Sequence, residues 1–235
     1  MKLTIVYDNN AFDPRLKTAW GFSALVEYDG HTLLFDTGGD APTLLENMDI
    51  LEIDPAQIEK VVISHDHGDH TGGLEGLLEQ NPVLTIYVIP SYSAGSRRRI
   101  SQTSTIVDVT AGQQLDEGIF TTGEMKSEIP EQSLFIPTSQ GLVVITGCAH
   151  PGVVRMIEEA QEMLDEPIHL VVGGFHLGKA NAQELDSILD AFRQIGVEKV
   201  APTHCTGDHA IELFEAEYKD DFIQAGVGKV IVVNP

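Results

Sequence analysis

Short runs of apolar residues, separated by turns rich in glycine, proline and acidic residues, recur along the whole chain. Three of these runs, at 3–7, 23–28 and 31–35, follow one another through loops, with no helical segment between them. Asp29-Gly30 separates the last two runs and is a strong signal for a tight hairpin turn. The opening part of the chain therefore predicts the strands of a mostly antiparallel sheet.

Strands and helices alternate in the rest of the chain. Apolar runs predict further strands at 60–63, 83–88, 105–109, 118–122, 132–136, 141–145, 168–172, 198–201 and 229–233. Apolar residues at helical spacing predict helices over 42–48, 74–81, 153–164, 181–195 and 208–217. Each half proceeds from strand pairs to strand–helix units, which predicts an α/β fold, a four-layer αββα sandwich of two facing sheets. No linker-like composition appears, so residues 1–235 are expected to form a single domain.

The amino-acid composition disfavours some classes of binding partner and indicates the cell compartment. The 235 residues carry a formal net charge of −22, which disfavours nucleic-acid backbones and anionic membranes as partners. The first apolar run is too short to cross a bilayer, and no secretory signal is recognisable. The two cysteines, Cys148 and Cys205, do not make a disulfide framework. These features predict a cytoplasmic protein with no nucleic-acid and no membrane partner.

The densest candidate chemistry is the segment His65-Asp66-His67-Gly68-Asp69-His70, directly after the predicted strand at 60–63. Neutral imidazole and carboxylate are ligands that zinc, iron and manganese accept. At a strand end, His65 and His67 can converge on one ion, and Asp69 and His70 can reach a second from the turn that follows. A solvated polar loop is the alternative, and the density of ligand types argues against it.

Further strand ends carry a histidine in a glycine-containing loop: His150, His176 and His204. A lone histidine is more often structural than a ligand, but strand ends at one sheet edge can converge. Together with the histidine segment, these loops favour a shared metal site. The remaining histidines, in a hairpin, inside a strand and at a helix start, are predicted to be structural or solvated: His31, His169 and His209.

These motifs resemble the metallo-β-lactamase superfamily, whose signature is the pattern HxHxDH found at residues 65–70. Asp36-Thr37-Gly38 resembles its first motif, and His150 and His204 resemble its later histidine motifs. The resemblance spans nearly the whole chain and implies two adjacent divalent metal ions, with zinc favoured and magnesium, manganese or iron as alternatives. It implies that Asp36 holds the histidine loop from behind through hydrogen bonds. The implied ligands are His65, His67 and His150 for one ion, and Asp69, His70 and His204 for the other.

One position departs from the superfamily pattern. Where the family usually has a bridging aspartate, this chain reads Gly173-Gly174-Phe175-His176. A neutral imidazole has one lone pair, so His176 can bind one metal but cannot bridge two, and it brings no negative charge. His176 is expected to be a metal ligand and, with Asp69, a catalytic residue. The missing carboxylate disfavours ordinary hydrolysis.

Three motifs, at 147–152, 173–177 and 202–207, resemble one subgroup of the superfamily, the archaeal 7,8-dihydropterin-6-ylmethyl-4-(β-D-ribofuranosyl)aminobenzene 5′-phosphate synthases of methanopterin biosynthesis. The subgroup implies a transferase that joins a dihydropterin methyl diphosphate to ribofuranosylaminobenzene 5′-phosphate with loss of diphosphate. Two alternatives stay open: a metallohydrolase of a phosphodiester, lactone or thioester, and a non-catalytic metal-binding or sensor domain.

A small-molecule anionic substrate is expected, and a homo-oligomer is left open. The cationic run Arg97-Arg98-Arg99 offers guanidinium groups for a phosphate, with a solvated loop as the alternative. Phe175 can stack on a pterin, although core packing is the favoured role for a large aromatic residue. Cys148 and Cys205 are expected to be buried small residues, with a thiolate ligand at Cys205 as the alternative.

Overall fold

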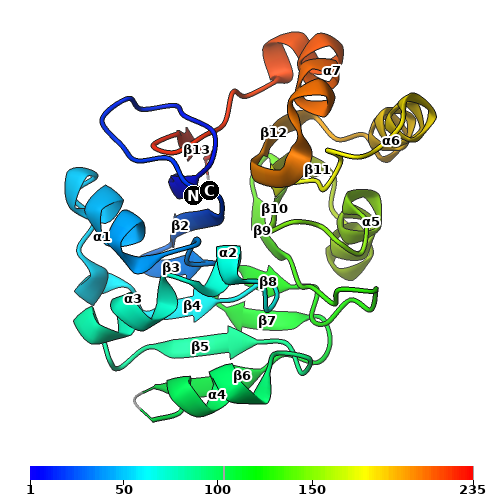
Figure 1. Cartoon of the computed structure of the whole chain (residues 1–235). Coiled ribbons are helices and arrows are strands. Elements are labelled where there is room, and N and C mark those ends of the chain that lie inside the picture. Colours follow the sequence, from blue (N-terminus) through cyan, green and yellow to red (C-terminus); the bar gives the residue numbers. More distant parts are fainter. Residues whose placement is uncertain (103, 235) are drawn as a thin grey trace. The chain divides into compact units, whose positions relative to one another are not determined.

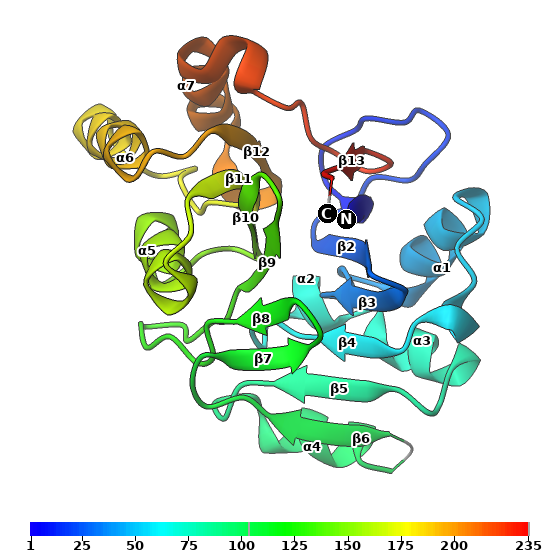
Figure 2. The same ribbon diagram turned by 180° about the vertical axis from the view of Figure 1, so that it is seen from behind.

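The computed structural model describes residues 1–102 and 104–234, and this part of the chain divides into two compact units. Unit 1 comprises Met1–Ala111 and Gly226–Val233, and unit 2 comprises Gly112–Ala225 with Asn234. Each unit contains a mixed β-sheet and its own helices (Figures 1 and 2). The single-domain prediction for residues 1–235 is not tested by this division and stays a prediction. Within the described residues, no helix has the length and apolar character needed to cross a membrane.

The sheet of unit 1 has the strand order β13-β1-β2-β3-β4-β5-β6. Pairing is antiparallel from β13 to β3, as predicted, and parallel from β3 to β6. The prediction of a mostly antiparallel sheet is therefore wrong for the second half of this sheet, because helical crossovers return the chain to the same end before each of these strands. The strand bounds are β1 (Lys2–Asp8), β2 (Phe22–Tyr28), β3 (His31–Phe35), β4 (Lys60–Val62), β5 (Thr85–Val88), β6 (Thr105–Asp108) and β13 (Val230–Val232).

The predicted hairpin between β2 and β3 is present. Asp29 and Gly30 have φ values of 48° and 86°, and Tyr28 pairs with His31 directly across the turn. Two consecutive left-handed residues give the backbone twist that a two-residue hairpin requires, which explains the Asp-Gly pair. β13 reaches the other edge of the sheet from the far end of the chain, where the Met1 amino group donates to the Val233 carbonyl at 2.7 Å.

The helices of unit 1 pack apolar side chains such as Leu44, Met48 and Leu77 into the core beside the sheet. Asp40 begins α1 by accepting a hydrogen bond from the Thr43 amide at 2.8 Å, with a proline in the first turn. Helix α4 was not predicted, because its sequence AGSRRRI lacks an apolar repeat. The helical bounds are α1 (Ala41–Ile50), η1 (Pro55–Gln57), α2 (Gly68–Thr71), α3 (Leu74–Gln80) and α4 (Ala94–Ile100).

The sheet of unit 2 has the strand order β12-β11-β10-β9-β8-β7. Its β7 to β10 pairs are antiparallel, and β10, β11 and β12 are parallel neighbours. The strand bounds are β7 (Gln113–Asp116), β8 (Ile119–Thr121), β9 (Leu134–Thr138), β10 (Gly141–Thr146), β11 (Ile168–Gly174) and β12 (Lys199–Thr203). Because carboxyl ends of parallel neighbours meet at one sheet edge, the loops after β10, β11 and β12 lie side by side.

Helices α5, α6 and α7 lie on one side of the unit 2 sheet (Figures 1 and 2). The rings of Phe175, Phe192 and Phe214 pack together there, with centroids 5.1 to 5.8 Å apart. Helix α6 begins with a capping box, in which Asn181 and Glu184 each accept from the other's amide. The helical bounds are α5 (Val153–Leu164), α6 (Ala182–Ile195), η2 (His204–Thr206), α7 (Asp208–Tyr218) and η3 (Lys219–Asp221).

Candidate metal centre

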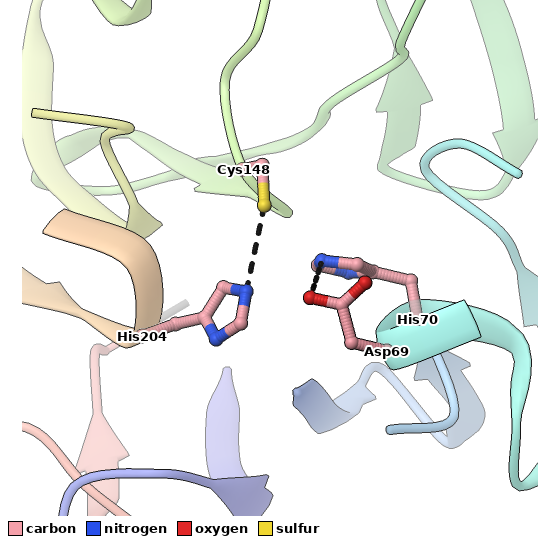
Figure 3. Close-up of side chains that lie close together, drawn as sticks. All are labelled: Asp69, His70, Cys148 and His204. Atoms are coloured by element: carbon pink, nitrogen blue, oxygen red, sulfur yellow. Dashed lines mark hydrogen bonds and ion pairs between the residues drawn. The ribbon is translucent and has the colours of Figure 1, made fainter. Parts of the chain in front are cut away.

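The histidine segment of unit 1 forms one compact cluster. His65 lies in the loop after β4, His67 immediately precedes the short helix α2, and Asp69 and His70 lie within that helix. The Nε2 atom of His65 lies 3.1 Å from Nδ1 of His67, and the rings of His65 and His70 have centroids 4.2 Å apart. The Nε2 atom of His70 lies 3.7 Å from the Asp69 carboxylate (Figure 3). The structure thus brings these four predicted ligands of unit 1 together.

Asp36 holds this cluster from behind, through contacts of the kind predicted for it. It follows β3, whose parallel neighbour β4 leads into the histidine segment, so the two loops are adjacent. The fully buried Asp36 carboxylate accepts hydrogen bonds from the Ser64 amide and hydroxyl, both at 2.7 Å, and lies 2.7 Å from Nδ1 of His70. A proton held on Nδ1 leaves Nε2 of His70 as the lone-pair nitrogen that a metal requires.

The loop that carries Asp36 rests on a buried tyrosine. Gly38 has a φ of 68°, and a side chain there would bring its Cβ within 2.3 Å of the Tyr7 ring. The Tyr7 hydroxyl donates to Asp40 at 2.7 Å. Burial, with the hydrogen bond to Asp40, raises the pKa of Tyr7 to about 12. The Thr37 amide donates to the His70 carbonyl at 2.8 Å, which ties this loop to helix α2.

In unit 2, the fully buried Glu131 contacts the Nδ1 atom of His150, as Asp36 contacts the Nδ1 atom of His70 in unit 1. Its carboxylate accepts hydrogen bonds from the amides of Cys148, Ala149 and His150 at 2.8 to 2.9 Å. It also lies 2.8 Å from Nδ1 of His150. This residue was missed as a functional candidate, because no histidine or cysteine stands near it in the sequence. Glu131 lies three residues before β9, and its complete burial is a property of the fold that the sequence does not reveal.

The other candidate ligands of unit 2 surround two sulfur atoms. The rings of His150 and His176 have centroids 4.5 Å apart. The Nε2 atom of His204 lies 3.4 Å from Sγ of Cys148 (Figure 3). Cys205, next in the chain, contacts the Cys148 carbonyl through its Sγ at 3.6 Å. The unit 2 histidines predicted as ligands therefore lie at one edge of the sheet, among both cysteines.

Hydrogen bonding across this group alters its protonation. Contact with Cys148, and then with His176, lowers the pKa of the Cys205 thiol, although burial opposes the change. In turn, the hydrogen bond to Cys205 raises the pKa of His176, against the effect of burial. The two side chains therefore favour a thiolate–imidazolium pair when no metal is bound.

The predicted substrate residues have other contacts. Arg97 donates to the carbonyls of Ile89 and Tyr92 and pairs with Asp108, while Arg98 donates to the Ala94 carbonyl. Arg99 pairs with Glu75 at 2.9 Å and lines a cavity of about 550 Å³ beside helix α2. Their phosphate-binding role stays a prediction.

Phe175 has a buried side chain that packs against the rings of Phe192 and Phe214. It also lines a cavity of about 240 Å³ together with His150 and His176. The ring therefore packs in the core and also borders a cavity, so both predicted roles, core packing and stacking on a substrate, are compatible with its position.

The fold and the histidine motifs define the class of this protein. The model of the metallo-beta-lactamase superfamily matches residues 21–216, and the chain belongs to this superfamily. The predicted fold class is thereby confirmed. The superfamily generally binds divalent metals, and the imidazole and carboxylate donors grouped in each unit suit zinc, iron or manganese.

More specific relatives are similar along their full length. The chain is 29% identical to the 7,8-dihydropterin-6-methyl-4-(beta-D-ribofuranosyl)-aminobenzene-5′-phosphate synthase of Methanocaldococcus jannaschii, over 97% of this chain and 95% of the relative. The crystal structure of Tm1679, a metal-dependent hydrolase of the beta-lactamase superfamily, superimposes with a TM-score of 0.85 at 29% identity and covers 100% of both chains. The metallo-beta-lactamase fold protein YhfI from Bacillus subtilis shares the fold at 16% identity, with a TM-score of 0.69 over 98% and 99% of the two chains. The predicted resemblance to the synthase subgroup is confirmed.

Proposed function

We propose that this protein is a metal-dependent transferase that joins a dihydropterin methyl diphosphate to ribofuranosylaminobenzene 5′-phosphate and releases diphosphate. The observation that carries this proposal is the similarity to the M. jannaschii synthase, which extends over 97% of this chain. His176 supports it, since an imidazole in place of a bridging aspartate makes water activation between two ions less favourable.

The proposed ligands of one divalent ion are His65, His67 and His150. The proposed ligands of a second are Asp69, His70 and His204, and His176 is a further ligand. Zinc is the favoured metal. Asp36 and Glu131 support this assignment, because each orients a proposed histidine ligand through its Nδ1 atom. Divalent ions bound there would neutralise the charge of a diphosphate leaving group.

In the proposed reaction, the amine nitrogen of one substrate attacks the methylene carbon of the other. The carbon–oxygen bond to diphosphate breaks, and the nitrogen gives up a proton. We assign that proton to the carboxylate of Asp69, which keeps free lone pairs when one oxygen binds a metal, and we assign to His176 a role in orienting the substrate. Phe175 and the arginines 97–99 are the proposed contacts for the pterin ring and for phosphate.

The test is direct. The purified, metal-loaded protein is supplied with both substrates, and diphosphate and the joined product are measured together. We expect both in equal amounts, with loss of both in His150→Ala. A protein with a full metal content that releases neither would contradict the proposal.

A metallohydrolase is the second candidate, because Tm1679 is named a metal-dependent hydrolase and matches this chain with a TM-score of 0.85. In that case diphosphate would be released without the amine substrate, or a generic phosphodiester, lactone or thioester would be cleaved. Bis-p-nitrophenyl phosphate, with His150→Ala as the matched control, separates this activity from the transferase.

A further inference from the structure

Two cysteines and a histidine meet at the sheet edge of unit 2. Cys148 follows β10, His176 follows β11 and Cys205 follows β12, and these strands are parallel neighbours. One ligand atom from each of the three side chains lies within 4.8 Å of the other two. This spacing is short enough for a single ion to contact all three after small side-chain adjustments.

The backbone around this group is built for close approach. Gly174 has no side chain, and a Cβ there would lie 2.7 Å from Sγ of Cys205. His176 and His204 have φ values of 55° and 50°, in the left-handed region that residues other than glycine seldom adopt. Strained residues of this kind persist where surrounding structure holds them, and they gather at functional sites.

The donor types indicate which ion fits. Two sulfurs and one imidazole form a soft ligand set, which favours zinc and disfavours magnesium and manganese. Three protein ligands would leave a fourth tetrahedral position for a water or a substrate, as in catalytic zinc sites. Thiolate sulfur would also supply the negative charge that His176 lacks where the superfamily usually has an aspartate.

We propose that Cys148, His176 and Cys205 bind a zinc ion, with both cysteines as thiolates. Binding releases two protons to solvent, one from the Cys148 thiol and one from the Cys205–His176 pair, and forms two Zn–S bonds and one Zn–N bond. This zinc site rests on the proposed function only through His176, which is a ligand in both assignments. It adds the sulfur atoms of Cys148 and Cys205 to the proposed metal ligands.

Cobalt substitution tests the site independently of activity. Since the chain has two cysteines, any cobalt–thiolate charge-transfer absorption in the near ultraviolet must come from Cys148 or Cys205. We expect this absorption when Co²⁺ is added to the metal-free, reduced full-length protein, and its loss when zinc is added afterwards. The absorption should fall by about half in Cys205→Ser, in line with one sulfur ligand in place of two. It should persist in His209→Ala, whose changed residue is an exposed histidine of helix α7.

A second measurement needs no variant. Zinc should slow the alkylation of both thiols by iodoacetamide several-fold in the wild-type protein, whereas magnesium should leave the rate unchanged. Cobalt binding without the charge-transfer absorption, or an absorption unaffected by Cys205→Ser, would overturn the proposed site. A failure of the transferase reaction, with the absorption present, would count against the proposed function and leave the zinc site standing.

Discussion

The candidate ligands of unit 1 and those of unit 2 are supported in different ways. In unit 1 they lie on one continuous segment, which Asp36 holds from the end of the neighbouring strand. In unit 2 they come singly from three strand ends, and the carboxylate that holds His150 is Glu131, 19 residues earlier in the chain. Both carboxylates are fully buried, and each contacts a backbone amide and an imidazole Nδ1. The comparison teaches that the buried carboxylate is the shared requirement, while the spacing of the histidines is free to differ.

Glu131→Ala should give the largest effect on stability. It leaves the buried amides of Cys148, Ala149 and His150 without their acceptor, so we expect the free energy of unfolding to fall by about 4 kcal/mol. Urea unfolding followed by circular dichroism measures this. Glu128→Ala, at an exposed position nearby, is the matched control, and a Glu131→Ala effect no larger than that control would mean that the loop holds its shape unaided.

Gly38→Ala tests how firmly the unit 1 loop is packed. The new methyl group meets the Tyr7 ring and occupies a left-handed position, so we expect a loss of about 3 kcal/mol in unfolding free energy. Gly30→Ala is the control, because its φ is also positive but nothing lies within 4 Å of its Cβ. It should cost only about 1 kcal/mol. Equal losses in the two variants would show that packing against Tyr7 contributes little.

Asp36→Asn tests the proposed metal role of unit 1 with little change in volume. The amide can keep one contact to Ser64, but it weakens the orientation of His70, so we expect metal affinity to fall roughly 10- to 100-fold. Competition with a chromophoric chelator measures the affinity. Asp49→Asn, at an exposed position, should bind metal as the wild type does. Unchanged affinity in Asp36→Asn would restrict Asp36 to a structural role.

The smallest expected effect is a pH dependence at Tyr7. Because the folded pKa is about 12 and the ordinary value is 10.0, the unfolded chain loses this proton first as the pH rises. The contribution of Tyr7 to the free energy of unfolding is therefore fully present below pH 10 and is lost as the pH rises towards 12. The loss is about 1 kcal/mol after allowance for screening. Unfolding titrations at pH 9 and pH 11 should show a smaller fall in Tyr7→Phe than in the wild type. An equal fall in the two proteins would exclude this residue as the source.

Predictions from the sequence were most accurate where a few consecutive residues carried the signal. The density of ligands at 65–70 marked unit 1, and the Asp-Gly turn marked the first hairpin. Glu131 was not recognised, because its contacts depend on how β9 and β10 bring its loop against Cys148 and His150. Strand β7 was missed because its residues are polar and partly exposed, at the edge of the sheet, so no apolar run marks it. The parallel half of the unit 1 sheet depends on crossover geometry, which the apolar pattern does not encode.

Strand β13 has a consequence for synthesis on the ribosome. It pairs with β1 at the edge of the unit 1 sheet, but it is encoded after the whole of residues 112–225. The nascent chain therefore carries an open edge at β1 while every residue of 112–225 is being made. We expect chaperones that recognise unpaired strands to engage this edge during translation, until the arrival of β13 closes it.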